Sequence, residues 1–323
     1  MKALYCRANA EDIGTLKLED VELPPLGANE IRIRVRAAAV NFPDILMVQG
    51  KYQHKPELPF IVGGERAGDV IAVGSGATRF KVGDRVVGGA LSGGFAEEAQ
   101  GPESSYRSIP GNADYAVASA YTTAYLTAYV SLVRRGELAK GETLLVHGAA
   151  GGVGLAAVDL GKVLGATVIA TASSDEKRTF LKSYGADHVL PSSGFRETVK
   201  ELTQGRGADV IYDPVGGDVF DESVRCIAFN GRILIVGFTS GRIPSVSVNM
   251  PLIKGFSVVG VRAGEYGRKF PEKGRENIEN IDKLLADRKV RPHIHARLPL
   301  SRALDAMHML TTRQVIGKVV IEP

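Results

Sequence analysis

The sequence predicts an α/β protein with two domains, one rich in β-strands and one built on a parallel sheet that helices cover on both faces. Its 323 residues exceed what a single hydrophobic core usually serves. Segments before about Pro110 are short and strand-like, whereas strands and helices alternate after Asn112. This change of pattern indicates that a different kind of domain begins there.

The first part of the chain has the pattern of antiparallel β-structure. Apolar and polar residues alternate over residues 31–37 (IRIRVRA), which predicts a strand with one buried face. Residues 69–73 (DVIAV) form a second such segment, and Gly83 with Asp84 predicts a turn that leads into another strand. Many short pieces of this kind predict a β-rich domain.

The second part has the pattern of a parallel sheet. Residues 114–135 contain few helix breakers and predict one long or two short helices. Continuous apolar strands then alternate with helices, as in a sheet buried on both faces. The predicted strands are 142–147, 167–171, 209–212, 232–236, 257–261 and 318–321, and the predicted helices are 153–164, 175–184 (closed by Gly185), 277–288 and 302–310, the last with Ser301 as its cap.

The composition excludes several classes of protein. Hydrophobic residues make up 44% and charged residues 24%, so neither disorder nor a fibrous architecture is expected. A net charge of +4 without a basic run argues against nucleic-acid binding. Cys6 and Cys226 are too few for a disulfide framework or a structural zinc site. With no signal-peptide pattern and no run of about 18 apolar residues, we expect a cytoplasmic protein.

The sharpest local signal is residues 144–154 (LLVHGAAGGVG), where an apolar strand stops at a turn of small residues and a helix begins. In the G-x-G-x-x-G register the three positions are Ala149, Gly151 and Gly154, so alanine replaces the first glycine. Gly151 would let a pyrophosphate approach the backbone, and Gly154 would let the helix pack closely on the strand. Glycine-rich turns also occur for steric reasons alone, but the coincidence of strand, turn and helix favours dinucleotide binding.

The choice of nicotinamide cofactor depends on the end of the second strand, where an acidic side chain would bond the adenosine ribose hydroxyls. Residues 170–174 (ATASS) contain no carboxylate that would repel a 2′-phosphate. Ser173 and Ser174 offer hydroxyls, and Lys177 with Arg178 stands at the start of the next helix, where an anion is favoured. The sequence therefore predicts NADPH rather than NADH. The competing interpretation is that Ser174 caps this helix and the two cations are solvated.

Six stretches, in order along the chain, resemble the zeta-crystallin-like quinone oxidoreductases of the medium-chain dehydrogenase/reductase superfamily. They are residues 39–52 (AVNFPDILMVQGKY), 59–68 (PFIVGGERAG), 81–86 (KVGDRV), 149–154 (AAGGVG), 213–217 (DPVGG) and 317–320 (GKVV). The resemblance implies a GroES-like catalytic domain, residues 1–124 and 265–323, around a Rossmann domain, residues 125–264. It also implies an active site in the cleft between them.

The resemblance is to the zinc-free members. Zinc-dependent members have a cysteine near the position of Asn41 or Phe42 and a histidine before the glutamate that corresponds to Glu65, where this chain has Gly64. The six histidines show no metal-ligand spacing. Without a Lewis acid, alcohol dehydrogenation is not expected. Reduction of a quinone or an activated C=C bond needs only hydride from the nicotinamide and donors near the oxygen that gains negative charge.

The resemblance also implies the site residues. Asn41 and Tyr52 would line the catalytic cleft, with Tyr52 as hydrogen-bond donor to the substrate oxygen, unless Tyr52 is only an aromatic half-buried in a loop. Asp44 either orients this loop or caps the helix after Pro43. The residues that motif and resemblance together assign to the cofactor are Asn41, Phe42, Thr127, Gly151, Gly152, Val153, Ser173, Ser174, Lys177, Ser192, Val215, Gly237, Phe238, Val261 and Lys318. For Thr127 the competing interpretation is a plain helical threonine.

The expected function is NADPH-dependent hydride transfer to quinones or α,β-unsaturated carbonyl compounds. A close alternative is an enoyl or acryloyl thioester reductase, because Arg262 stands where the family commonly has an aromatic beside the substrate and would favour an anionic substrate. A third possibility is an NADPH-binding protein with a regulatory or structural role. By resemblance we further expect a homodimer, paired through the strand at residues 257–261.

Overall fold

The computed structural model describes residues 1–323 and divides them into two compact units. Unit 1 comprises Met1–Thr122 and Pro292–Pro323, and unit 2 comprises Thr123–Arg291. The sequence had suggested a second boundary after residue 264. The structure moves it to residue 291 because α8 (Ala263–Lys269) and α9 (Pro271–Ala286) pack on unit 2, where Arg134 Nε donates to Asn277 Oδ1 at 2.8 Å.

Unit 1 contains two sheets with mainly antiparallel pairing. β1 (Lys2–Cys6) lies between β2 (Lys17–Asp20) and β4 (Phe60–Ile61). The larger sheet has the order β15-β16-β3-β5-β6-β8, with β7 also paired to β3. Its strands are β3 (Glu30–Ala39), β5 (Glu65–Val73), β6 (Arg85–Gly89), β7 (Glu98–Pro102), β8 (Tyr106–Ser108), β15 (Ile294–Pro299) and β16 (Lys318–Glu322).

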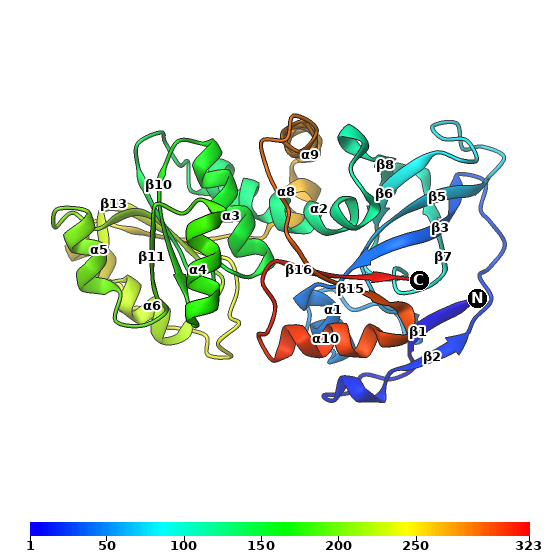
Figure 1. Ribbon diagram of the computed structural model, residues 1–323, viewed down its shortest axis with the longest axis horizontal. Helices are drawn as coiled ribbons and strands as arrows, with labels where there is room; N and C mark the ends of the chain where they lie inside the picture. The colour runs from blue at the N-terminus through cyan, green and yellow to red at the C-terminus, as the bar shows by residue number, and fades with distance from the viewer. The chain divides into compact units, whose positions relative to one another are not determined.

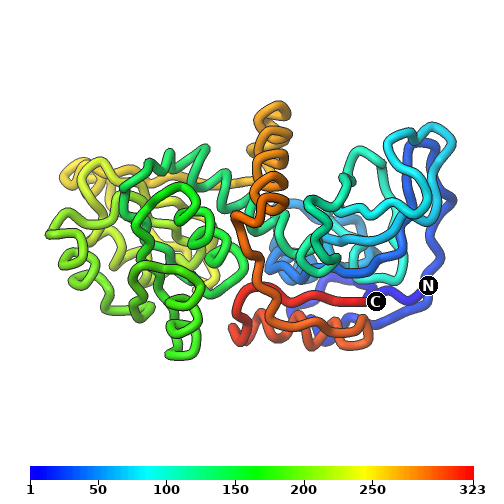
Figure 2. Tube along the Cα trace, turned by 45° about the horizontal axis from the view of Figure 1, so that its top comes forward, coloured from blue at the N-terminus to red at the C-terminus, as the bar shows by residue number.

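The tail of the chain completes the sheet of unit 1. β16 pairs antiparallel with β3, where Val320 lies opposite Ala39, so both ends of the chain belong to this unit (Figures 1 and 2). The predicted alternation in β3 is confirmed, since Ile31, Ile33 and Val35 are buried in the core. The helices of the unit are α1 (Phe42–Val48), α10 (Ala303–Thr311) and the first part of α2 (Tyr115–Tyr129).

The assignment of Ser301 as a helix cap is wrong. A 3-10 turn over Leu300–Arg302 takes up this residue, and α10 begins only at Ala303, with Arg302 as its N-cap and no side-chain cap. A short 3-10 turn is common at the start of an α-helix, and it shifted the beginning of α10 by one residue.

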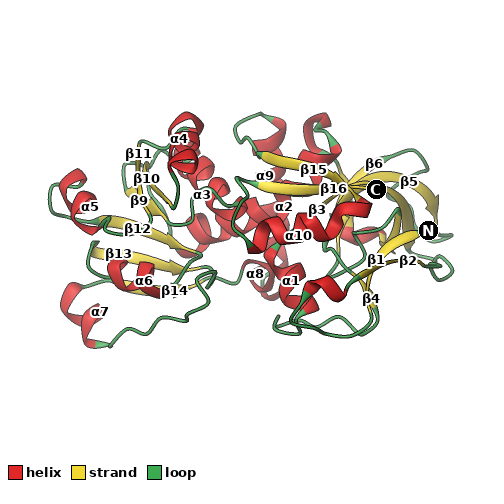
Figure 3. Ribbon diagram, turned by 60° about the horizontal axis from the view of Figure 1, so that its bottom comes forward, coloured by secondary structure: helices red, strands yellow, loops and turns green.

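Unit 2 is built on a six-stranded parallel sheet, in the order β11-β10-β9-β12-β13-β14 (Figure 3). The strands are β9 (Thr143–Val146), β10 (Thr167–Ala172), β11 (His188–Pro191), β12 (Ala208–Asp213), β13 (Ile227–Ile235) and β14 (Ser257–Gly260). Numbered along the unit, this order is 3-2-1-4-5-6, which is that of a Rossmann domain. All five strands predicted here are confirmed, whereas β11 was missed because it is a short edge strand that ends in proline.

Helices cover both faces of this sheet. α3 (Gly152–Val163) and α4 (Asp175–Tyr184) pack on one face, and α5 (Arg196–Leu202) and α6 (Gly217–Ser223) lie on the other (Figure 1). The core under α5 and α6 includes Leu145, Ile169, Ile211 and Ile233 from four neighbouring strands. Because all strands run parallel, the loops that follow them gather at one edge of the sheet.

One helical stretch, Tyr115–Arg135, is long and apolar enough to cross a membrane by length and composition. It consists of α2 and a π-helical segment, Val130–Arg135, and 61% of its most apolar window is buried inside the protein. The core helix of a soluble protein satisfies the same criterion.

Candidate functional sites in the two units

The carboxyl edge of the sheet in unit 2 brings together most of the residues predicted to contact a cofactor. The register places Val146 of β9 beside Ala170 and Tyr212, and Ile235 of β13 beside Asp213 and Gly260. The predicted residues that directly follow these strand ends are Gly151, Gly152, Val153, Ser173, Ser174, Ser192, Val215, Gly237, Phe238 and Val261. They come from six strands and therefore share one edge, where α/β sheets bind ligands.

The two glycines of the turn after β9 have different surroundings. A Cβ on Gly154 would lie 2.3 Å from Gly148 O and 2.7 Å from Ala149 Cα, so no side chain fits there. A Cβ on Gly151 would meet only Gly148 O, at 3.4 Å, and is otherwise in open space. Gly154 thus allows α3 to pack against the turn, while Gly151 leaves the backbone open to a ligand. This is the division of roles expected for a pyrophosphate-binding turn.

The amino end of α3 offers donors to that open space. Gly151 is the N-cap, and the Leu155 N–H is the first to bond back into the helix, to Gly151 O at 2.8 Å. The N–H groups of Gly152, Val153 and Gly154 therefore have no acceptor within the helix, and a glycine cap supplies none from a side chain. The first turn holds no acidic residue. These groups and the helix dipole fit the pyrophosphate of a dinucleotide.

The end of β10 combines a helix cap with exposed polar groups. Ser174 is the N-cap of α4, and its hydroxyl accepts from Lys177 N at 3.3 Å. Arg178 donates to Ala172 O at 3.2 Å and forms an ion pair with Asp175 at 2.5 Å. The capping interpretation of Ser174 is therefore correct, and Arg178 is held by protein groups. Ser173 is exposed and Lys177 half-buried.

Asp213 is a buried carboxylate at this edge that sequence reasoning did not single out. Its Oδ1 accepts from the backbone N–H groups of Val215 at 2.8 Å and Gly216 at 2.9 Å, which holds the turn after β12. Its Oδ2 is buried and has no partner, and burial raises the pKa of this carboxyl. An acidic residue at the end of a buried strand was the available signal.

Two other polar residues of unit 2, Thr127 and His147, are satisfied within the protein. Thr127 Oγ1 donates to Thr123 O at 2.7 Å, as in an ordinary helical threonine. The ring of His147 is buried between Thr171 Oγ1, at 3.0 Å, and Ser223 Oγ, at 2.8 Å. Burial lowers the pKa of His147 to about 3, so the ring is neutral and joins β9 to β10 and α6.

A buried polar cluster lies in unit 1, where β3 ends and β5 and β16 begin. The pairing of β3 with both neighbours, Ala39 opposite Glu65 and Val320 opposite Ala39, brings Asn41, Glu65 and Lys318 together. Asn41 Nδ2 donates to Glu65 Oε2 at 2.8 Å, and Lys318 Nζ donates to Val40 O at 3.0 Å and to Asn41 Oδ1. The Lys318 ammonium also lies 3.9 Å from Glu65 Oε2. The carboxamide of Asn41 is therefore held in one orientation.

Asp44 supports the same cluster from α1. Its carboxylate accepts from Asn41 N at 2.7 Å and from Gly64 N at 3.1 Å. Asp44 therefore has both of the roles considered from the sequence. It caps α1, and it orients the loop by bonding this helix to the segment before β5. Burial raises the pKa of Asp44 to about 7, and burial lowers the pKa of Lys318, against the charges of Glu65 and Asp44. Lys318 was expected near the cofactor, and its ammonium is bonded to the loop that carries Asn41.

Tyr52 and Phe42 flank this cluster in sequence. The Tyr52 ring is half-buried against the core of unit 1, and its edge faces His54 with 6.4 Å between ring centroids. Its hydroxyl makes no hydrogen bond within the protein, so it is free to donate to a ligand. The Phe42 side chain is 39% exposed at the first turn of α1.

Comparison with known proteins identifies the family. Residues 27–132 match the model described as alcohol dehydrogenase GroES-like domain, and residues 152–282 match that of zinc-binding dehydrogenase. The chain is 41% identical over 301 residues to the quinone oxidoreductase-like protein 2 homolog of Nematostella vectensis, covering 92% of this chain and 82% of that protein. This chain belongs to the quinone oxidoreductase family of the medium-chain dehydrogenase/reductase superfamily. It is also 36% identical over 313 residues to a quinone oxidoreductase of Pseudomonas aeruginosa, covering 95% of each.

Solved structures of the family have the same fold. Mycobacterial Rv1454c, complexed with NADPH, superposes with a TM-score of 0.89 at 32% identity and full coverage of both chains. The Escherichia coli quinone oxidoreductase, also complexed with NADPH, gives a TM-score of 0.89 at 28% identity and full coverage of both. One matching family model is named for zinc binding. Nowhere in residues 1–323, however, do three or more His, Cys, Asp or Glu side chains form a group that could hold a metal ion.

Proposed function

We propose that this oxidoreductase binds NADPH and transfers its hydride, without zinc, to a quinone or an α,β-unsaturated carbonyl compound. The observation that carries this proposal is the turn after β9. There is open space beside Gly151 and none beside Gly154, and the N–H groups at the start of α3 have no acceptor within the helix. The two NADPH complexes among the family structures support the choice of cofactor. The absence of a carboxylate from residues 170–174 leaves room for a 2′-phosphate beside Ser173, Ser174 and Lys177.

Unit 1 would supply the groups that position substrate and nicotinamide. When bound, the cofactor supplies a hydride, and negative charge develops on the substrate oxygen. The Tyr52 hydroxyl has no partner in the protein and would donate to that oxygen. Asn41 Nδ2 donates to Glu65 and, over 3.4 Å, to Ala39 O, and its Oδ1 accepts from Lys318, so one lone pair of Oδ1 remains for a ligand.

A thioester reductase is the second candidate, because of Arg262. Its side chain is 54% exposed at the start of α8, where it could meet an anionic group. Glu265 lies 3.9 Å from Arg262 and 3.0 Å from Arg268, so two cations share this carboxylate. An exposed guanidinium at this position favours an anionic acceptor such as an acyl-coenzyme A thioester.

A screen of NADPH oxidation tests both candidates. The acceptors are 9,10-phenanthrenequinone, a neutral enone and an enoyl-coenzyme A, each with and without a zinc chelator. We expect turnover with a quinone or enone that the chelator does not change. Turnover of the thioester alone, lost in Arg262→Ala, would favour the second candidate. Tight NADPH binding with no turnover on any acceptor would replace both with a non-catalytic binding role.

We also propose that two copies pair through β14. This strand is at the edge of the sheet, so its outer backbone groups are unpaired. Large apolar side chains are exposed on and near it, with Val258 39%, Val248 86% and Leu252 82% exposed. Light scattering should give the mass of a dimer at micromolar concentration, and a monomer would contradict the proposal.

A further inference from the structure

A cavity lies at the amino edge of the sheet in unit 2, opposite the edge described above. Its volume is about 320 Å³, and it is lined by the residues that precede β12 and those that begin β13, among them Gly207 and Ile227. The strands of this sheet are parallel, so the amino ends of β12 and β13 lie at the edge away from the glycine turn that follows β9. A ligand here would be separate from a cofactor bound at the carboxyl edge.

The lining of this cavity is strongly basic. It includes Lys200, Arg206, Arg225 and Lys254 and no carboxylate. The guanidinium of Arg225 is exposed and makes no hydrogen bond or ion pair. The ammonium of Lys254 has a single partner, Val224 O at 2.9 Å.

The nearest carboxylates only weakly compensate the other two cations. Lys200 lies 3.6 Å from Glu197, and Arg206 lies 3.9 Å from Asp209, both beyond ordinary hydrogen-bond length. Burial and then the charges of Lys200 and Arg225 lower the pKa of Lys254, as expected for cations crowded together. A polyanion would relieve this repulsion.

An aromatic ring stands at the rim of the same cavity. Phe229 is 81% exposed and lines the cavity together with the four cations. The ring is nevertheless held in place, because it packs on Gly255, where an added Cβ would lie 2.4 Å from Phe229 Cε2. The adjacent Asn230 N donates to Gly255 O at 2.6 Å and fixes the turn. The ring thus forms a rigid, exposed stacking surface.

We propose that this cavity is a second ligand site, which binds a nucleotide-sized polyphosphate with its phosphates against Lys200, Arg206, Arg225 and Lys254 and its planar base against Phe229. Four cations call for more than one negative charge, and arginine pairs well with phosphate oxygens. The volume is within the range of small-ligand sites, and bases stack favourably on aromatic side chains. This binding does not depend on the hydride transfer proposed above.

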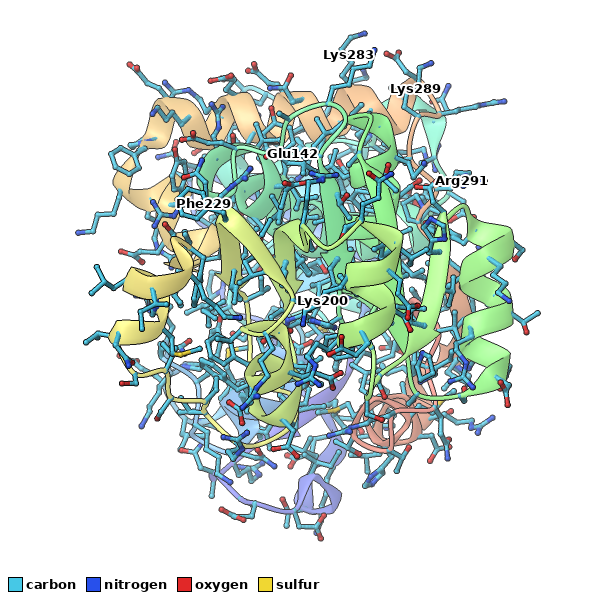
Figure 4. The ribbon with its side chains drawn as sticks, turned by 90° about the vertical axis from the view of Figure 1, so that its left-hand side faces the viewer. Glu142, Lys200, Phe229, Lys283, Lys289 and Arg291 are labelled. Atoms are coloured by element: carbon cyan, nitrogen blue, oxygen red, sulfur yellow. The ribbon has the colours of Figure 1, made fainter.

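Calorimetry on the protein saturated with NADPH tests the site, with ATP and inorganic tripolyphosphate as probes in magnesium-free buffer. Figure 4 looks onto this end of unit 2, with Lys200 near the middle, Phe229 above it to the left and Lys289 at the upper right. The test variants are Arg225→Gln/Lys254→Gln and Phe229→Ala. Lys289→Gln is the matched control, because Lys289 is an exposed lysine of unit 2 that does not line the cavity.

We expect one ATP per chain, with an affinity that does not change as NADPH is raised. The double variant should bind ATP and tripolyphosphate about tenfold or more weakly than the wild type, and Lys289→Gln should bind both with unchanged affinity. Phe229→Ala should bind ATP about fivefold or more weakly, whereas its affinity for tripolyphosphate should be unchanged. The proposal is overturned if ATP binding disappears as NADPH rises, which would locate it at the cofactor edge, or if the double variant binds as the wild type does. NADPH binding, measured separately, keeps these outcomes distinct from failure of the proposed function.

Discussion

Gly154→Ala should destabilise the protein and Gly151→Ala should leave its stability nearly unchanged, but both should weaken NADPH binding. The added methyl at position 154 would lie 2.3 Å from Gly148 O and 2.7 Å from Ala149 Cα, which are backbone atoms and cannot rotate away. Alanine is ordinarily favoured over glycine inside a helix by about 1 kcal/mol, so any decrease in the free energy of unfolding reports the steric overlap. Overpacking of this kind costs about 1–3 kcal/mol. The turn and the start of α3 must shift together.

At position 151 the methyl meets only Gly148 O at 3.4 Å, and the backbone angles, φ −78° and ψ 168°, suit alanine. The change in unfolding free energy should stay within about 1 kcal/mol, because the weaker N-cap is offset by the stiffer unfolded chain. The methyl would nevertheless occupy the space that a pyrophosphate needs. Thermal unfolding and NADPH titration of both variants check this. If Gly154→Ala kept both its melting temperature and its NADPH affinity, or if Gly151→Ala bound NADPH normally, the reasoning would be wrong.

Four further changes test the two candidate sites. Lys177→Ala should weaken the binding of NADPH much more than that of NADH in parallel titrations, because only NADPH carries the 2′-phosphate. An equal loss of affinity for both cofactors would contradict the assignment. Tyr52→Phe should change the unfolding free energy by less than about 0.5 kcal/mol, because the hydroxyl has no partner in the protein. It should lower kcat for a quinone by about tenfold, and an unchanged kcat would exclude Tyr52 as the donor. Lys318→Met should destabilise the protein by about 3–5 kcal/mol, since it removes the buried cation beside Glu65, and adding Glu65→Gln should recover part of the loss in a double-mutant cycle. Simple additivity would show that the two charges are not coupled. Burial raises the pKa of Asp44 to about 7, so the native state holds a proton that the unfolded state releases near pH 4. The contribution of Asp44 to the free energy of unfolding therefore falls as pH rises from about 4 to 7. Denaturation of Asp44→Asn beside the wild type should therefore show a difference that grows in favour of the variant over this range, and a constant difference would contradict the shifted pKa.

Local patterns in the sequence predicted the features that are formed by neighbouring residues. The turn of residues 147–151 is such a feature, because strand, turn and helix follow each other directly and each leaves its own signal. Strand β3 was predicted from its alternation, and α4 from its length and Gly185, which adopts φ 119° at the end of the helix. Strand β11 and the start of α10 were not, since a short edge strand and a 3-10 turn leave weak signals.

The contacts of the candidate site in unit 1 could not be predicted in this way. Lys318 and Asn41 are 277 positions apart, and their bond exists only because β16 returns to pair with β3. The resemblance pointed to both residues but not to Glu65 as the partner that holds the other end of the carboxamide. The boundary at residue 291 has the same origin, because it depends on where α8 and α9 pack rather than on what they contain.

The charge of the cluster in unit 1 explains how it can be buried at all. Glu65 and Lys318 carry opposite charges 3.9 Å apart and share Asn41 as a common hydrogen-bond partner, so each charge is compensated. Asp44 would add a second negative charge, and burial instead favours its protonated form up to a pKa of about 7. The cluster is thus close to neutral below that pH. Because Lys318 is its single cation, replacing this lysine alone must cost more than replacing the lysine together with Glu65.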